Sequence, residues 1–218
     1  MEAIQAVNQA AAIPKETQML LKLREDRFFD KIPPQEVAEI IEKAAQSGGK
    51  LASELKQKYP DMDARKIAEA LGLEVREKEL PIDEQFVSVG YFEAPRLIVI
   101  NRKMHEMDPF YHEEYPWLAA YPWEDIAIAH EMFHYFQEQQ VVDFVDTYRV
   151  PLWKLGPYTH QTPIASLGEI AAMNFAEVLL TLDFYPGYLE MFLAAPYFPK
   201  EIANKAAQLL VEAKKYEE

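Results

Sequence analysis

The chain has 218 residues, half of them hydrophobic, which is enough apolar material for a substantial core and excludes wholesale disorder. Its 36 acidic and 22 basic residues give a net charge of −14, which argues against a broad phosphate-binding surface and so against nucleic acid as a direct partner. The absence of cysteine excludes disulfides and thiolate metal sites, so histidine and carboxylate side chains are the ligands that remain for a metal.

The sequence contains neither the pattern of a secretory signal peptide nor that of a membrane-spanning helix. Residues 1–16 lack the basic start and the apolar run of a secretory signal peptide. No apolar run approaches the roughly 18 residues of a membrane span. We therefore expect a cytoplasmic protein without a membrane partner, and the oligomeric state stays open.

Residues 1–72 have helical patterns throughout. Apolar residues recur at helical spacing, and Pro33-Pro34, Gly48-Gly49 and Pro60 interrupt them. We expect residues 1–63 to form a helical N-terminal extension and residues 64–218 to form the main domain. The predicted helices cover residues 18–29, a segment that starts near Val37 and ends at Gly48-Gly49, residues 51–59, and residues 64–71 with Asp63 as N-cap and Gly72 as C-cap.

From Leu73 onward the apolar period changes from helical to alternating. Residues 73–77, 86–92 and 96–101 are predicted strands, and Glu93-Ala94-Pro95 is the expected hairpin turn between the last two. An acidic, aromatic loop over residues 104–122 is expected next. Its His105 and His112 have no second ligand at helical spacing, so we interpret both as solvated loop histidines.

The C-terminal part of the chain alternates between helical and irregular patterns. Residues 124–139 and 166–182 are predicted helices, and residues 199–216 form an amphipathic one. Pro151, Gly156, Pro157 and Pro163 predict a mostly irregular connection over residues 141–162. Together with the small sheet, these elements predict an α+β fold.

His130-Glu131-Met132-Phe133-His134 is the most informative motif, because it lies within the predicted helix 124–139. Two histidines four residues apart lie on one helix face, where both imidazoles can reach one Zn²⁺ at about 2.0–2.1 Å. Glu131 follows the first histidine, where it can act as general base on a zinc-bound water. The alternative is a chance match on a buried helix, which five histidines in the chain make uncommon.

A catalytic zinc needs a third protein ligand and an open position. Without cysteine the candidates are His160, Glu169, Glu177 and Asp183. Glu169 is best placed, near the start of the helix that follows. The alternative for this residue is a capping box, Ser166-x-x-Glu169, in which Glu169 bonds the Ser166 amide. Local sequence leaves the two about even.

The chain resembles the ImmA/IrrE-type metallopeptidases. The resemblance rests on five segments: Leu71-Gly72-Leu73-Glu74-Val75, Val89-Gly90-Tyr91-Phe92, the strand Leu97-Ile98-Val99-Ile100-Asn101, Ile128-Ala129-His130-Glu131-Met132-Phe133-His134-Tyr135-Phe136, and Glu169-Ile170-Ala171-Ala172-Met173-Asn174-Phe175-Ala176. It covers residues 64–182 and implies a gluzincin-like domain with a small sheet packed on the motif helix and on a ligand helix. It also implies His130, His134 and Glu169 as zinc ligands and transcriptional repressors as a substrate class. Two positions depart from the family pattern: Phe133 replaces a glycine, and Met173 replaces Asn or Asp.

The expected function is therefore that of a zinc-dependent endopeptidase that hydrolyses a protein or peptide substrate, with Glu131 as general base. A hydrogen-bond donor for the oxyanion is also expected. Tyr158 and His160 are the sequence candidates for it. The alternative is a catalytically weak or inactive metal-binding module that binds a protein partner, which the departures at Phe133 and Met173 favour and the presence of Glu131 opposes.

Overall fold

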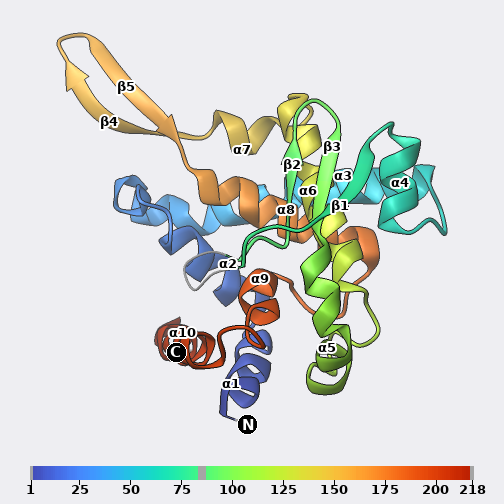
Figure 1. The fold of residues 1–218 in the computed structure, drawn as a ribbon. Coiled ribbons are helices and arrows are strands. Elements are labelled where there is room, and N and C mark those ends of the chain that lie inside the picture. The colour runs from blue at the N-terminus through green and yellow to red at the C-terminus, as the bar shows by residue number, and fades with distance from the viewer. Residues whose placement is uncertain (1, 83–86, 217–218) are drawn as a thin grey trace.

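The computed structural model describes residues 2–82 and 87–216, and it has an α+β fold in which helices surround a small sheet (Figure 1). The α-helices contain about half of the chain, so the predicted fold class is confirmed at this level. They are α1 (Glu2–Ala11), α2 (Lys15–Arg24), α3 (Val37–Lys58), α4 (Ala64–Ala70), α5 (Asp108–Glu114), α6 (Trp123–Glu138), α7 (Asp143–Thr147), α8 (Ala165–Leu180), α9 (Leu189–Leu193) and α10 (Pro199–Ala213).

The sheet has three strands in the order β1-β3-β2, with β1 (Glu74–Lys78) parallel to the central β3 (Leu97–Asn101) and β2 (Gly90–Glu93) antiparallel to it. Strand β3 is the most buried because it is flanked on both sides. The strands predicted over 73–77 and 96–101 are confirmed to within one residue. Of the strand predicted over 86–92, only residues 90–92 lie in β2, and Phe86 lies outside the described residues. The turn that follows covers residues 94–96, one residue later than predicted. Strand β2 is at an edge of this sheet and packs beside α6.

Helices α6 and α8 pack against each other at the centre of the molecule, and α3 covers the other side of α8 (Figure 1). Helix α8 is buried along most of its surface because its sequence, ASLGEIAAMNFAEVLL, is largely apolar. Its left-handed C-cap at Thr181 ends it two residues before the predicted end. The fold thus places the predicted ligand helix between two others, and its orientation is tightly constrained.

Helix α3 runs without a break through Gly48 and Gly49, so the prediction that a helix ends there is wrong. A Cβ at Gly48 would lie 2.1 Å from the Ala171 carbonyl oxygen of α8. The glycine therefore permits a close helix crossing and does not terminate the helix. The packing partner that gives Gly48 this role is more than 100 residues away in the chain, which is why local sequence favoured a helix end.

Replacing Gly48 with alanine is expected to destabilise the fold by about 1–3 kcal/mol, because the added methyl group would overlap the backbone of α8. Gly49→Ala is the matched control. A Cβ there meets the Asn174 side chain at an ordinary 3.5 Å, and alanine stabilises a helix interior by about 0.5–1 kcal/mol. Urea denaturation would measure both free energies of unfolding. Equal losses in the two variants would contradict a role for Gly48 in the crossing.

The N-terminal helices pack against the C-terminal half of the chain. Helix α1 lies along α10, and the two termini lie on the same side of the molecule (Figure 1). Helix α4 begins where the sequence predicts, since the Asp63 carboxylate accepts a hydrogen bond from the Lys66 amide at 2.8 Å. Gly72 follows it with φ of 76°, as expected for a helix-ending glycine.

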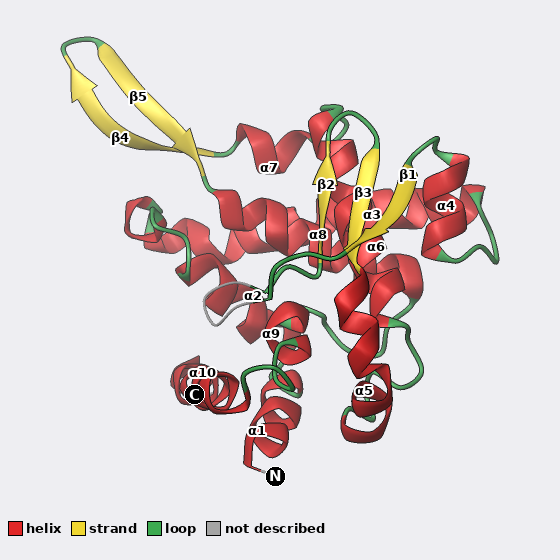
Figure 2. Cartoon of the chain, in the orientation of Figure 1, coloured by secondary structure: helices red, strands yellow, loops and turns green. Residues whose placement is uncertain are grey.

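Two segments predicted to be irregular have regular structure. Residues 104–122 contain the 3-10 helix η3 (Arg102–Met107) and α5, and residues 141–162 contain α7 and most of a hairpin of β4 (Arg149–Leu155) and β5 (Tyr158–Pro163). This hairpin projects from the body of the molecule (Figure 2). Both strands are sheet edges, so Pro151 can sit in β4, at a register shift, without removing a ladder bond from a central strand.

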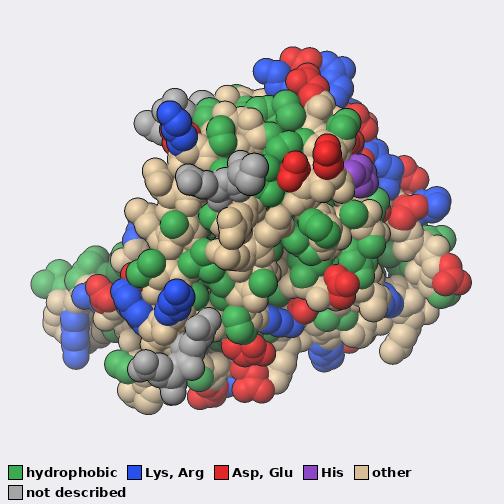
Figure 3. Space-filling model, turned by 90° about the horizontal axis from the view of Figure 1, so that it is seen from below, with side chains coloured by type: hydrophobic (Ala, Val, Ile, Leu, Met, Phe, Trp, Pro, Cys, Tyr) green, Lys and Arg blue, Asp and Glu red, His purple; other side chains and the backbone are tan. Residues whose placement is uncertain are grey.

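Surface charges are interspersed on the face shown in Figure 3, where acidic and basic side chains are scattered among hydrophobic ones. Such a surface differs from the single-sign patch that binds a phosphate backbone. None of the helices in the described part of the chain combines the length and the apolar character needed to cross a membrane.

Candidate metal centre

Three predicted ligands converge at the crossing of α6 and α8. His130 and His134 lie one turn apart on α6, and their Nε2 atoms are 3.0 Å from each other. Glu169 reaches across from α8, with one carboxylate oxygen 3.5 Å from His130 Nε2 and the other 3.5 Å from His134 Nε2. The structure therefore brings together two imidazoles and one carboxylate from two helices.

The spacing of these donor atoms fits a tetrahedral metal site. Ligand bonds of about 2.0–2.1 Å at tetrahedral angles separate the donor atoms by about 3.3–3.4 Å. The two Nε2 atoms are 3.0 Å apart, and each lies 3.5 Å from a different oxygen of the Glu169 carboxylate, so these contacts are close to that spacing. Two Nε2 atoms that face each other cannot both act as acceptors without a proton or a cation between them. The donor set, two nitrogens and one carboxylate oxygen, is also one that zinc prefers.

Glu169 faces the histidines and does not cap its own helix. Helix α8 begins at Ala165, so Glu169 lies beyond the first turn. The Ser166 amide, which a capping box would pair with Glu169, instead donates to the Asp26 carboxylate at 3.1 Å. The capping-box alternative is therefore wrong, because a side chain 140 residues earlier in the chain takes that role.

Burial and mutual charge set the protonation of the three ligands. Burial, with a smaller contribution from His134, lowers the pKa of His130 to about 4, so its imidazole is neutral as metal binding requires. Burial acts to raise the pKa of Glu169, but His130 and His134 outweigh it and the net shift is downward. Near neutral pH the site thus offers a neutral His130 and an ionised carboxylate.

Glu131 lies beside the ligands without being one of them. Its side chain is buried, 8% exposed, and lines the same cleft as His130 and Glu169. Burial raises the pKa of Glu131 to about 8, and Glu190 and Glu169 contribute to this rise. A cation held by the three ligands would oppose the rise, because a nearby positive charge favours the carboxylate.

The ring of His134 is oriented by a chain of hydrogen bonds that sequence reasoning missed. His134 Nδ1 is 3.1 Å from Gln137 Oε1, and Gln137 Nε2 donates to Asp146 at 2.7 Å. Because Asp146 accepts from the amide nitrogen, the amide oxygen of Gln137 faces the imidazole and accepts from Nδ1. This leaves the Nε2 lone pair of His134 free for a metal. The i+3 spacing of Gln137 from His134 was the available sequence signal.

Gln137→Leu is expected to weaken zinc binding by about 10–100-fold, because it removes the partner that orients His134 and sets its tautomer. Glu138→Gln, at an exposed neighbouring position, is the matched control and should bind zinc like the wild type. Competition with a chromophoric chelator would give both affinities. Unchanged affinity in Gln137→Leu would mean that His134 needs no such partner.

The other third-ligand candidates lie away from the two histidines. The Glu177 carboxylate is 2.5 Å from Lys15 Nζ, and Asp183 is exposed. His160 stacks on Trp153 in the projecting hairpin, with ring centroids 5.3 Å apart. Tyr158, also on the hairpin, is 58% exposed. None of the four lines the cleft that holds Glu131, so the hairpin residues are poor candidates for an oxyanion donor.

A second group of possible ligands, Glu77, His105 and Glu124, lies between β1 and the start of α6. The Arg65 guanidinium pairs with both carboxylates of this group, at 3.3 Å from Glu77 and also with Glu124. His105 Nδ1 is 2.9 Å from Asp108, whose other oxygen accepts from Trp123. Because a cationic side chain already bridges the carboxylates, we interpret this group as an ion-pair network. His105 is half-buried in it, so the expectation of a solvated loop histidine is wrong.

Open space flanks the metal centre on two sides. A cleft of about 640 Å³ is lined by His130, Glu131 and Glu169 and extends toward α2, α9 and α10. A second cleft, of about 770 Å³, is lined by His134 and by Phe92 of β2. Gly90 of β2 borders the first cleft, so this edge strand runs from one cleft to the other.

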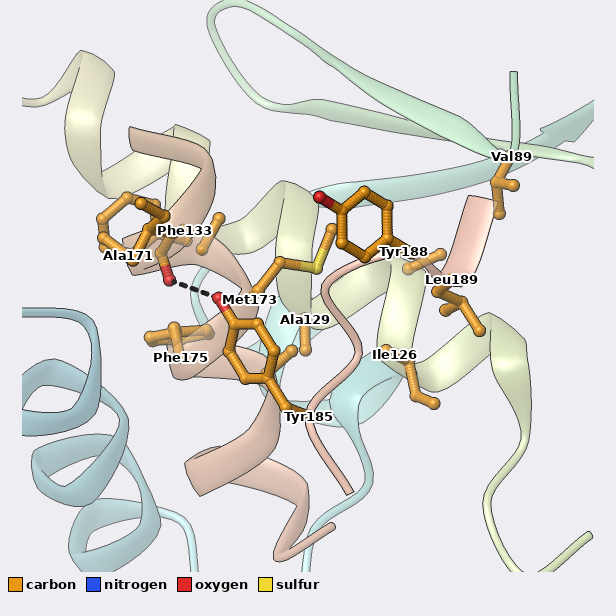
Figure 4. Close-up of a cluster of buried hydrophobic side chains, with 14 of the residues drawn as sticks. Val89, Ile126, Ala129, Phe133, Ala171, Met173, Phe175, Tyr185, Tyr188 and Leu189 are labelled. Atoms are coloured by element: carbon orange, nitrogen blue, oxygen red, sulfur yellow. Dashed lines mark hydrogen bonds between the residues drawn. The ribbon is translucent and has the colours of Figure 1, made fainter. Parts of the chain in front are cut away.

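The two departures from the family pattern have different surroundings. Phe133 is fully buried and packs on Phe175 of α8, with ring centroids 5.9 Å apart (Figure 4). It lines neither of the clefts that flank the metal centre. Met173 does line the first cleft, one turn beyond Glu169. The larger residue at 133 thus fills core space between the two helices.

Comparisons of the chain with protein-family models, with curated proteins and with solved structures found no match.

Proposed function

We propose that this protein is a zinc-dependent endopeptidase of the ImmA/IrrE type, with a gluzincin-like arrangement of motif helix and ligand helix. The observation that carries the proposal is the convergence of His130, His134 and Glu169, whose nitrogen and oxygen atoms lie 3.0–3.5 Å apart. Beside them Glu131, which is not a ligand, lines the open cleft. Three protein ligands with space beside them are typical of a catalytic zinc, whereas structural zinc sites are closed by four.

The ligands and the base have separate roles. His130, His134 and Glu169 would hold the zinc, and Gln137 keeps the His134 ring in position. Bound zinc supplies Lewis acidity, which lowers the pKa of a water molecule and polarises a carbonyl group. This division leaves the carboxylate of Glu131 free for proton transfer.

Glu131 moves the proton during hydrolysis. As the oxygen of water bonds to the scissile carbonyl carbon, one proton of that water passes to the Glu131 carboxylate. The same carboxyl group then gives the proton to the leaving nitrogen as the C–N bond breaks. Burial of Glu131 supports both transfers, because a carboxyl group shielded from water has its pKa nearer to neutrality.

The clefts on either side support cleavage within a chain and not at its end. An extended peptide lying along β2 would pass from the first cleft to the second, with the ligands beside its middle. The edge of β2 that faces away from β3 can supply main-chain hydrogen bonds to such a peptide. The resemblance points to a transcriptional repressor as the substrate, and a flexible segment of such a protein would fit this description.

The test is metal analysis of the purified protein together with digestion of an unbiased peptide library. We expect about one zinc per chain. We also expect internal cleavage products in mass spectra, which a chelator abolishes and added zinc restores. A zinc-loaded protein that cleaves nothing across a broad library would contradict the proposal and favour the inactive binding module.

A further inference from the structure

The hairpin of β4 and β5 carries an exposed apolar face. Trp153, Leu155 and Tyr158 are 52%, 73% and 58% exposed, and they are three of the six exposed large hydrophobic side chains in the part of the chain that the structure describes. The Trp153 ring lies 5.6 Å from that of Tyr158 and stacks on that of His160 at 5.3 Å, measured between centroids. Apolar side chains gathered on a two-stranded ribbon indicate a surface that a partner covers.

The two faces of the hairpin differ in chemistry. The register pairs Trp153 with His160. Two residues along β4, it pairs Leu155 with Tyr158. Because paired residues share a face and successive pairs alternate, these four side chains lie on one face. Lys154 belongs to the pair between them and lies on the opposite face. One face of the ribbon is therefore apolar and aromatic, and the other carries a cation.

The hairpin is basic, whereas the rest of the chain is acidic. Residues 149–163 contain two of the chain's 22 basic residues, Arg149 and Lys154, and none of its 36 acidic ones, so the other residues have a net charge of −16. Both cations are exposed. They favour an acidic partner, and they disfavour a second copy of the hairpin, whose cations would repel them. Two cations are also few for a phosphate backbone, which proteins bind with roughly 6–10 contacts.

The base of the hairpin lines the cleft on the His134 side of the metal centre. Arg149 and Pro163 border this cleft of about 770 Å³ together with His134 and Phe92 of β2. From there the hairpin projects away from the body of the molecule (Figure 2). The seven residues of β4, at about 3.3 Å each, extend over roughly 23 Å. A peptide that leaves the metal centre through this cleft therefore meets an edge of the hairpin.

We propose that the β4–β5 hairpin is a docking site for the substrate protein, which adds to it a strand in which apolar and acidic residues alternate. This inference rests on the proposed peptidase function and adds the class of substrate. Both strands of the hairpin have a free edge, which can bond the main chain of an added strand. Alternate side chains of that strand point to opposite faces. The apolar ones cover Trp153 and Tyr158, and the acidic ones lie on the face of Lys154.

Fluorescence anisotropy with a labelled peptide of about 12 residues, in which glutamate and leucine alternate, tests the docking site. The Glu131→Gln protein is the background, so that the probe stays intact. On this background Trp153→Ser should weaken binding by about 10–30-fold, and Lys154→Glu by about 5–10-fold. Val211→Ser is the matched control, since it makes the same replacement at a similarly exposed position on α10, and it should bind like the background protein.

Two further peptides separate strand addition from general attraction. A peptide of the same composition with all glutamates in one half should bind about 10-fold more weakly, because it cannot place apolar and acidic side chains on opposite faces. A peptide in which lysine replaces glutamate should bind Lys154→Glu more tightly than it binds the background protein. This recovery would also show that the hairpin of Lys154→Glu remains folded.

Cleavage links the docking site to the metal centre. An alternating tail fused to a cleavable peptide from the library should lower the KM of wild type by about 10-fold and leave kcat unchanged, because its contacts are the same in the ground and transition states. It should do so at one end of the peptide only, since one end leaves through the cleft that the hairpin borders. Trp153→Ser should lose this gain in KM, and Val211→Ser should keep it.

Four results would overturn the inference. Equal binding of the probe by Trp153→Ser, Lys154→Glu and the background protein would exclude the hairpin while peptide cleavage by wild type still stands. Tighter binding of a single-stranded oligonucleotide through the hairpin would assign it to nucleic acid. A dimer in sedimentation equilibrium that Trp153→Ser dissociates would assign it to a second copy of the chain. If wild type neither binds zinc nor cleaves peptides, the proposed function fails and takes the role in substrate docking with it.

Discussion

Glu131→Gln is expected to retain one zinc per chain and to lose about 10²–10⁴-fold in the rate of peptide hydrolysis. Glutamine has nearly the same shape as glutamate, so it fits the buried position, but its amide cannot take a proton from water. Glu131 is not one of the three converging ligands, so zinc affinity should change little. Steady-state cleavage of a library-derived peptide, with zinc content measured on the same preparation, checks both parts.

Glu138→Gln is the control for this experiment, because it makes the same chemical change on the same helix at an exposed position. It should cleave at the wild-type rate. Hydrolysis that persists undiminished in Glu131→Gln would rule out this carboxylate as the general base. A variant that loses both zinc and activity would instead assign Glu131 to metal binding.

The second large effect is expected for the ligands themselves. His130→Ala and His134→Ala should abolish stoichiometric zinc binding, and Glu169→Gln should weaken it by more than about 100-fold. Loss of a mere orienting partner already costs about 10–100-fold, and a direct ligand contributes more. A neutral amide in place of the Glu169 carboxylate also removes the negative charge that faces the two histidines.

Glu177→Gln and His160→Ala are the matched controls, since both residues were candidates for the third ligand. Glu177 pairs with Lys15, and His160 lies on the projecting hairpin, so zinc affinity should stay at the wild-type value in both variants. Isothermal titration with a competing chelator would give the affinities. Tight zinc binding by Glu169→Gln would mean that the third ligand is another residue.

Local patterns predicted the parts of the fold in which local physics dominates. The apolar, β-branched run Leu97-Ile98-Val99-Ile100 indicated a strand, and the structure places it at the centre of the sheet. The Asp63 cap and the left-handed Gly72 were predicted because a cap and a helix-ending glycine act within one turn of the chain. The helical spacing of His130 and His134 likewise placed both rings on one face.

The predictions failed where a partner distant in sequence decides the outcome. Gly48 lies against the backbone of Ala171, which leaves no room for a side chain, and the Ser166 amide donates to Asp26. Both partners are more than 100 residues away in the chain, so local sequence cannot indicate either contact. The hairpin of β4 and β5 was hidden by prolines that a two-stranded ribbon tolerates.

The pairing of α1 with α10 has a consequence for synthesis on the ribosome. Helix α1 is synthesised about 200 residues before α10, which covers its apolar face. Domains that depend on such non-local contacts close slowly, and the waiting apolar segments are exposed to aggregation. Helix α3 is likewise synthesised before α8, the helix that covers it. The nascent chain should therefore need protection by a chaperone until α10 has emerged.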